Sequence, residues 1–405
     1  ARCTAQERDL TVGRHVAVRN APKYFFHSPI DVHNYFLSTS SAWSSAASIL
    51  GQNGSGPAMT IASLFTKGRG SYVCVLNDQE EAGYFYHDLM QLTASNEVYF
   101  FPSAFRRAIK YGHVDPANEI LRTEVLSRLQ DPDASFVIVT YPDALAERVV
   151  AREVLKENTL KISVGEKLDN MFVSDVLDEY GFEQVDYVYE PGQYALRGSI
   201  LDVFSFSNEF PYRIDFFGDE VETIRTFDVE TQLSKEKLDS IYIVPEMSKN
   251  AKDSTSLLGS LPRNTFIAAR ELAWCKERIG SVWNDDPVVA DEESFAVIAQ
   301  MRKKLVRGEA FLREVLDFRR IHFGARPMGT ADATIHFSTQ TQPIYHKNFD
   351  RVSESFHKYL DEGYALYILS DQEKQANRIR MIFEDSGDNI PFTAVNRTIH
   401  EGFAD

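Results

Sequence analysis

The segment from Tyr187 to Phe227 consists of short runs of alternating residues that are separated by turn-forming groups. Turns are predicted at Pro191-Gly192, at Ser207-Asn208-Glu209 and at Gly218-Asp219, because these residue types favour the dihedral angles of tight turns. Runs of this length between such turns predict strands joined by hairpins. The segment therefore predicts an antiparallel sheet, and it constrains the fold more than any other stretch of the chain.

One strand of this sheet, Tyr212–Phe217, alternates between two kinds of face. Successive side chains of a strand point to opposite sides, so Tyr212, Ile214 and Phe216 share one face. The other face carries an arginine, an aspartate and a phenylalanine: Arg213, Asp215 and Phe217. Aromatic residues and arginine on a rigid exposed face are typical of a binding surface. A second covered face, with Phe217 inside a core, is an equally weighted alternative.

Residues 71–150 alternate between predicted strands and predicted helices. The strands are Tyr72–Leu76, Glu97–Phe101 and Phe136–Thr140, and the helices begin at Asp78, at Asp115-Pro116 and at Pro142. Asp at the N-cap and Pro at the first helical position are favourable helix starts. Such βα alternation predicts a parallel sheet that is covered on both faces.

The remainder of the chain has less regular patterns. Residues 38–48 are predicted as a loop or a small helix, and residues 262–323 as helices. Residues 324–350 form a connection that is rich in turn-forming residues. A small βα unit follows, with helices at Val352–Leu360 and Gln372–Phe383 around a strand at Ala365–Leu369.

The sequence from Gly51 to Ala58 has the spacing of a phosphate-binding loop but lacks its chemistry. Such loops have the pattern G-x-x-x-x-G-K-[ST], in which lysine and a hydroxyl group hold the phosphates and Mg²⁺. Gly51 and Gly56 are at the required positions, but Pro57 replaces the lysine and Ala58 the hydroxyl residue. This is either a degenerate phosphate loop or a flexible loop before a helix. Both interpretations predict that ATP does not bind and that the chain needs no cofactor.

The composition limits the classes of function. The net charge is −16, which argues against DNA binding by this chain alone, because phosphate contacts dominate such binding. Three widely spaced cysteines indicate a reducing compartment, and no apolar run is long enough for a membrane span. We therefore expect a cytoplasmic protein with no membrane contact. Because the chain does not begin with Met, we also expect it to be a piece of a longer protein.

We find no motif for catalysis or for metal binding, and we expect neither. The basic patch and the two acidic clusters are interpreted as solvated surface; they are Arg106, Arg107 and Lys110, Asp285 and Asp286, and Asp291, Glu292 and Glu293. No DExH-type pair follows a strand with a working phosphate loop. The sequence therefore favours a binding module over an enzyme.

Two parts of the predicted sheet carry a family resemblance. The sequence EPGQYALRGSILDVF, starting at Glu190, and the sequence PYRIDFFGDEVETIRTFDVETQ, starting at Pro211, resemble the second domain of bacterial transcription-repair coupling factors (Mfd). The corresponding domain of the excision-repair helicase UvrB is more distantly similar. FFPSAFRRAIKYG and ANEILRTEVLSRL also resemble the first domain of coupling factors. Tyr111 alone stands where UvrB has a tyrosine-rich hairpin, so we expect that hairpin to be absent.

The resemblance implies a multidomain α/β chain. A helicase-like, parallel-sheet domain similar to the first domain of UvrB would comprise residues 1–156 and a helical continuation at 246–335. An α+β domain with an antiparallel sheet would be inserted at 157–245. A small α/β domain would complete the chain at 336–405.

The resemblance also implies a function and a site. In the family this region recruits UvrA, the damage-recognition ATPase of nucleotide excision repair, to stalled RNA polymerase, and it packs against the motor. The UvrA-contacting residues match Arg197, Arg213 and Phe217. RNA polymerase and DNA would be bound by domains outside this chain, as would the ATP and Mg²⁺ of an ATP-hydrolysing translocase. The alternatives are a fragment of a UvrB-like ATP-dependent helicase and an interaction scaffold with another partner.

Overall fold

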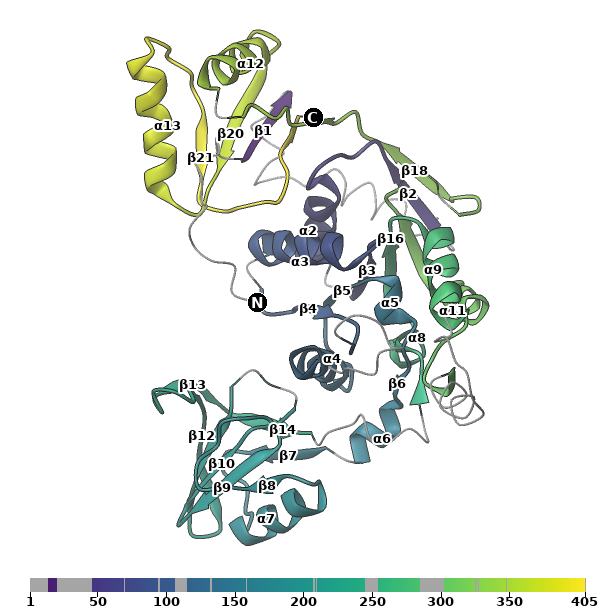
Figure 1. The fold of residues 1–405 in the computed structure, drawn as a ribbon, viewed down its shortest axis with the longest axis vertical. Coiled ribbons are helices and arrows are strands. Elements are labelled where there is room, and N and C mark those ends of the chain that lie inside the picture. The colour runs from purple at the N-terminus through teal and green to yellow at the C-terminus, as the bar shows by residue number, and fades with distance from the viewer. Residues whose placement is uncertain are drawn as a thin grey trace, which may run out of the picture.

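The computed structural model describes most of the chain. The described residues are 14–19, 46–68, 70–93, 95–105, 115–131, 133–157, 159–206, 208, 210–244, 254–284, 302–324, 326, 328–346 and 348–404. They form three larger sheets with helices around them (Figure 1). Among these residues, no helix is both long and apolar enough to cross a membrane.

The largest sheet has seven strands, and all of its neighbouring pairs are parallel. The order is β18-β2-β17-β16-β3-β5-β4. The strands are β2 (Ala46–Leu50), β3 (Tyr72–Val75), β4 (Val98–Phe101), β5 (Val137–Thr140), β16 (Phe266–Ala269), β17 (Arg319–His322) and β18 (Ala333–His336). The predicted parallel sheet and the α/β class are confirmed.

Helices lie on both sides of this sheet (Figure 1). One side has α2 (Gly56–Gly68) and α3 (Gln79–Thr93), and the other has α9 (Leu272–Asn284) and α11 (Gly308–Val315). The shorter or peripheral helices are α4 (Pro116–Arg128), α5 (Pro142–Leu145), α6 (Arg152–Glu157) and α8 (Leu257–Ser260). As predicted, α4 begins after Asp115, whose carboxylate accepts a hydrogen bond from the Ala117 N–H (3.1 Å). Strands and helices share one large apolar core.

A six-stranded sheet with a separate core forms the second unit, at the bottom of Figure 1. Its order is β13-β12-β11-β10-β9-β8, antiparallel except for the pair of β8 with β9. The strands are β8 (Glu183–Gln184), β9 (Gln193–Arg197), β10 (Ile200–Val203), β11 (Tyr212–Phe217), β12 (Glu220–Phe227) and β13 (Ser234–Leu238). Its core also contains residues of α7 (Asn170–Glu179) and of the two-stranded ribbon β7 (Leu160–Ser163) and β14 (Ser240–Ile243). The predicted antiparallel sheet is therefore confirmed.

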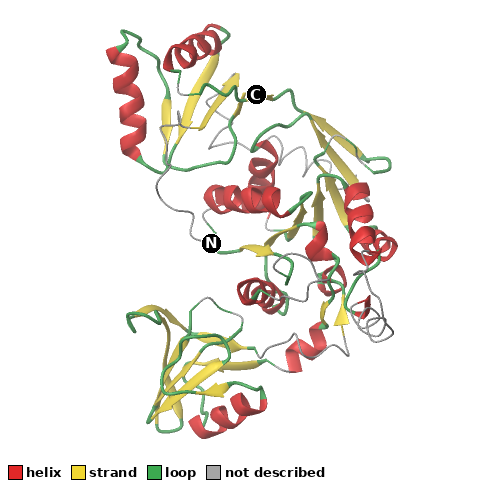
Figure 2. Cartoon of the chain, in the orientation of Figure 1, coloured by secondary structure: helices red, strands yellow, loops and turns green. Residues whose placement is uncertain are grey.

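The third sheet joins the two ends of the chain. It has the order β19-β22-β1-β20-β21, with β1 (Arg14–Arg19), β19 (Gln340–Thr341), β20 (Tyr364–Leu369), β21 (Thr393–Val395) and β22 (Phe403–Ala404). Its helices α12 (Phe349–Asp361) and α13 (Glu373–Asp385) are the long red helices at the top of Figure 2. The sequence predicts this βα unit but not the pairing of β1 with β20. A short ribbon of β6 (Val149–Val150) and β15 (Ser254–Thr255) completes the strands.

Three predictions of local structure are wrong. The segment 262–323 is not entirely helical, because β16 and β17 lie within it and pair with each other in the parallel sheet. The helix predicted from Pro142 to Val150 ends at Leu145, and residues 46–48, within the predicted loop or small helix, belong to β2. Ala46, Ala47, Ala268 and Ala269 have weak strand propensity, so burial between neighbouring strands determines these elements.

Candidate functional site: the open face of the antiparallel sheet

The alternation predicted for β11 is present in the structure. Tyr212, Ile214 and Phe216 are buried in the core against α7. Arg213 and Asp215 on the other face are half-buried, and Phe217 is 79% exposed. We call this second side of β9 to β12 the open face.

Phe217 stands at the end of β11, next to the hairpin that leads into β12. Gly218 has a φ of +64° and therefore a left-handed backbone that suits glycine. Phe217 pairs with Glu220 in the register of the hairpin, so the strand ladder holds its backbone. A large aromatic side chain on a fixed backbone can contribute apolar contact area at low entropic cost.

Arg213 is held closely by its neighbours rather than extended into solvent. Its Nε donates to Asp202 Oδ1 (2.6 Å) and its Nη2 to Asp202 Oδ2 (2.8 Å). The same Nη2 donates to Gln232 Oε1 (3.0 Å), and the guanidinium lies 4.2 Å from the centre of the Phe227 ring. The hydrogen bonds to Asp202 raise the pKa of Arg213, against the opposing effect of burial.

Arg197 reaches the same carboxylate from the other side. Its Nη2 donates to Asp202 Oδ2, and its Nη1 donates to the backbone carbonyl of Asp186 (2.8 Å). Its guanidinium also lies 5.0 Å from the centre of the Tyr187 ring. The structure thus joins the two candidate arginines through Asp202, while Phe217 lies on the same face closer to the hairpin.

The residues that organise this face were not predicted from the sequence. Asp202 of β10 pairs directly with Arg213 in the register of the sheet, and Gln232 orients the same arginine. A second ion pair, between Arg225 and Asp215, crosses from β12 to β11. The available signal was the acidic residue in the otherwise apolar run ILDV of β10, because a carboxylate at such a position needs a partner.

The loop that resembles a phosphate loop connects β2 to α2, as a phosphate loop would. Two of its backbone donors are already occupied: Asn53 N–H donates to Thr339 Oγ1 (2.7 Å), and Ser55 N–H donates to the carbonyl of Glu401 (3.1 Å). A Cβ at Gly54, where φ is +55°, would lie 2.8 Å from the carbonyl oxygen of Gly402. Carbonyl and hydroxyl oxygens of the chain thus accept two backbone hydrogen bonds of a loop whose N–H groups would bind phosphates.

We call residues 397–403 the strap, because they connect β21 with β22 of the third sheet and contact α3 of the parallel-sheet unit on the way. Arg397 donates to the backbone carbonyl of Leu92 (3.1 Å), and His400 N–H donates to the buried Asp88 (2.6 Å). The His400 ring also stacks on Tyr84 of α3, with 3.5 Å between the ring centres. These contacts hold the strap over α3 and the loop.

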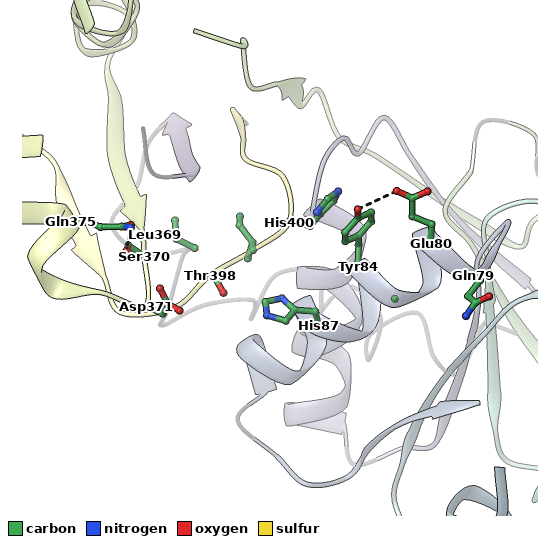
Figure 3. Close-up of a pocket in the computed structure, with 12 residues that line it drawn as sticks. Gln79, Glu80, Tyr84, His87, Leu369, Ser370, Asp371, Gln375, Thr398 and His400 are labelled. Carbon is green, nitrogen blue, oxygen red and sulfur yellow. Dashed lines mark hydrogen bonds between the residues drawn. The ribbon is translucent and has the colours of Figure 1, made fainter. Parts of the chain in front are cut away.

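A groove of about 880 Å³ lies beside the strap (Figure 3). Tyr84 and His87 of α3 line one side, and Asp371, Thr398 and His400 line the other. Within the described ranges, no group of three or more His, Cys, Asp or Glu side chains is arranged to hold a metal ion. The basic patch at 106–110, Tyr111 and the acidic clusters at 285–286 and 291–293 lie outside the described residues.

Comparison with known proteins agrees with this arrangement. The family model for the UvrB interaction domain matches residues 160–248, which include the whole six-stranded sheet. The transcription-repair-coupling factor of Escherichia coli (strain K12) is 28% identical over 226 residues, which cover 55% of this chain and 19% of that protein. That of Haemophilus influenzae (strain ATCC 51907 / DSM 11121 / KW20 / Rd) is 32% identical over 192 residues, 46% of this chain and 16% of that protein.

A third relative matches nearly the whole chain. The transcription-repair-coupling factor of Staphylococcus aureus (strain bovine RF122 / ET3-1) is 20% identical over 435 residues, which cover 92% of this chain and 37% of that protein. The chain therefore spans well under half the length of these relatives. It is similar over most of its length to a transcription-repair-coupling factor, and its residues 160–248 match the family model for the UvrB interaction domain.

Proposed function

We propose that this chain is a docking module that recruits UvrA to sites of stalled transcription. The open face of the six-stranded sheet binds UvrA, and Phe217, Arg213 and Arg197 form the contact. The UvrB interaction domain and the relationship to coupling factors support this proposal.

The exposure of Phe217 is the observation that carries the proposal. At 79%, it is the most exposed of the large hydrophobic side chains in the described part of the chain. Exposed aromatic residues in protein interfaces often contribute a large share of the binding energy. Arg197, Arg213 and Arg225 on the same face add planar guanidinium groups, which pack well against apolar and polar partner surfaces.

A calorimetric titration of purified UvrA into the wild-type chain tests the choice of partner. We expect binding with a dissociation constant in the micromolar range or tighter, corresponding to about −8 kcal/mol. Because the module contains a UvrB interaction domain, we also expect an excess of UvrB to compete for UvrA. Absence of binding would contradict the choice of UvrA and favour a scaffold with another partner.

We also propose that the chain itself is not an enzyme and binds no nucleotide. Pro57 and Ala58 replace the residues that would hold phosphate and Mg²⁺, and Glu401 of the strap and Thr339 accept backbone hydrogen bonds of the loop. A thermal-shift measurement with millimolar ATP and Mg²⁺ tests this, because a bound ligand stabilises the folded state. We expect no shift; a shift of several degrees would favour the UvrB-like helicase instead.

The remaining contacts of the proposed function belong to other parts of a longer protein. RNA polymerase and DNA would be bound there, an ATP-dependent motor would act there, and this module would contact that motor. The proposed setting is the cytoplasm, where UvrA and RNA polymerase both act.

A further inference from the structure

Asp202 is the residue at which the two candidate arginines meet. It lies in the middle of the sheet on β10, between β9 with Arg197 and β11 with Arg213. Its side chain is only 1% exposed, whereas those of Arg213 and Arg197 are 14% and 35% exposed. A nearly inaccessible carboxylate thus lies beneath two arginines that are nearer the surface.

The three side chains satisfy one another's hydrogen bonds. Oδ1 of Asp202 accepts from Arg213 Nε, and Oδ2 accepts from Arg213 Nη2 and from Arg197 Nη2. A buried carboxylate needs such partners, because its charge is costly away from water. Asp202, Arg197 and Arg213 together carry a net charge of about +1, so this part of the surface is positively charged.

The same contacts fix the positions of the arginines before any partner arrives. Arginine has many rotamers, and ordering them on binding reduces affinity. The Nε and Nη2 groups of Arg213 already donate hydrogen bonds to Asp202 and Gln232. A partner carboxylate would therefore have to displace Asp202 to form a bidentate contact with Arg213.

We propose that Asp202 is a positioning residue for docking: it holds the guanidinium groups of Arg197 and Arg213 in place on the open face, the same face from which Phe217 projects. The inference rests on the proposed function, and it specifies the chemistry of the partner surface. The UvrA surface that meets Arg213 offers apolar area or neutral oxygen acceptors, not a carboxylate that replaces Asp202.

The test is an Asp202→Asn variant, which keeps the side-chain size and removes the charge. The wild-type chain, this variant and Asp178→Asn are titrated with purified UvrA, and circular dichroism checks folding. Asp178 is the matched control, because its carboxylate also accepts a side-chain hydrogen bond, from Tyr194 (2.8 Å). Tyr194 belongs to the core on the helix side of the sheet, away from the open face. We expect Asp202→Asn to weaken binding at least about tenfold and Asp178→Asn to change it less than about threefold.

A second readout separates positioning from a general structural role. In a background in which Arg197 and Arg213 are both replaced by Lys, we expect the further change Asp202→Asn to weaken binding by less than about threefold, because both positioned guanidinium groups are already lost. Independent, multiplicative losses in the triple variant would overturn the proposal. If Asp202→Asn does not fold, Arg213→Lys alone decides: a loss of about tenfold despite the retained charge supports positioning, and unchanged affinity overturns it.

A spectroscopic readout does not depend on the partner. The Nε–H of Arg213 should give a resolved, slowly exchanging NMR signal in the wild-type chain, and this signal should be lost or exchange rapidly in a folded Asp202→Asn variant. If wild-type chain fails to bind UvrA, the proposed function fails, whereas the NMR result still tests the arrangement. If wild-type and Asp202→Asn bind UvrA equally, docking stands and the role of Asp202 is overturned.

Discussion

Ser55 and Glu401, which are 346 positions apart, exchange two hydrogen bonds. The N–H of Ser55 donates to the carbonyl of Glu401 (3.1 Å), and the N–H of Glu401 donates to Ser55 Oγ (3.0 Å). The loop that would bind phosphate in a nucleotide-binding protein thus binds a segment of this chain. The contact also joins the third sheet to the parallel-sheet unit, so the loop has a structural role in this chain.

Replacing Gly54 by Ala should destabilise the protein. The new Cβ would meet the carbonyl oxygens of Gly402 at 2.8 Å and Glu401 at 3.1 Å, at a backbone φ of +55°. We expect a loss of about 1–3 kcal/mol in the free energy of unfolding, measured by urea denaturation. Hydrogen exchange of residues 397–403 should accelerate as the strap loosens.

Gly83→Ala is the matched control for this prediction. Gly83 lies within α3, and a Cβ there meets nothing within 4 Å. Alanine favours the helix, so we expect this variant to be stabilised by about 0.5–1 kcal/mol. Equal stability of Gly54→Ala and wild type would contradict the close contact between loop and strap.

His322 should make the stability depend on pH. It is 1% exposed on β17, and within the described residues both ring nitrogens lack a hydrogen-bond partner. Burial, with a smaller effect of Arg320, lowers the pKa of His322 to about 4. The unfolded chain, with a pKa of about 6.5, therefore binds the proton more readily, so the stability present above pH 6.5 is lost as pH falls toward 4.

Between pH 7 and pH 5 this loss should reach about 2 kcal/mol. Urea denaturation at the two pH values measures it, and His322→Leu should reduce the difference by that amount. His87→Asn, at an exposed position, should leave the difference unchanged. An identical pH dependence in wild type and His322→Leu would show that the pKa of His322 is the same in the folded and the unfolded chain, which would contradict its burial as a neutral ring.

Arg213→Ala should also destabilise the second unit, because it leaves Asp202 buried with one partner fewer. We expect a loss of about 2–4 kcal/mol in thermal or urea unfolding. Arg263→Ala is a suitable control, since Arg263 pairs with Asp317 (3.0 Å) at the surface, with side chains 76% and 58% exposed. An exposed pair contributes less than about 1 kcal/mol. Similar losses for both variants would contradict the buried character of the Arg213 ion pair.

Docking to UvrA should depend only weakly on salt. Asp202 and Asp215 pair with Arg197, Arg213 and Arg225, which leaves a net charge of only about +1, and the contact centres on an aromatic side chain. Salt screens exposed charges strongly and apolar contacts little. Calorimetry at 50 and 300 mM NaCl should therefore give dissociation constants within about fivefold of each other; a change of a hundredfold or more would indicate that unpaired charges drive binding.

The sequence predicted those features that depend on local periodicity. The two-residue repeat of β11 placed Arg213 and Phe217 on one side, and the βα alternation predicted the parallel sheet. Short strands such as β16, with the sequence FIAA, were missed because alanine-rich runs fit a helix equally well. The segment becomes a strand because β3 and β17 on either side need partners for their backbone hydrogen bonds.

Features that depend on distant pairing were not predictable from a single sequence. The role of Asp202 follows from the register that aligns it with Arg213. The hydrogen bonds of the loop at Ser55 follow from its contact with Glu401, which is distant in the sequence. An arginine can bind a carboxylate through two parallel hydrogen bonds. In the structure, Asp202 forms this bidentate contact with Arg213. The four predicted domain ranges remain a prediction.

The most direct test of the docking account is calorimetry of purified UvrA with the wild-type chain, Phe217→Ala and Ile344→Ala. Ile344 is 78% exposed, as much as Phe217, but lies outside the six-stranded sheet. The account predicts that Phe217→Ala weakens binding by about 2 kcal/mol or more, a factor of about thirty, and that Ile344→Ala leaves it unchanged. Equal affinity of wild type and Phe217→Ala would contradict docking through the open face.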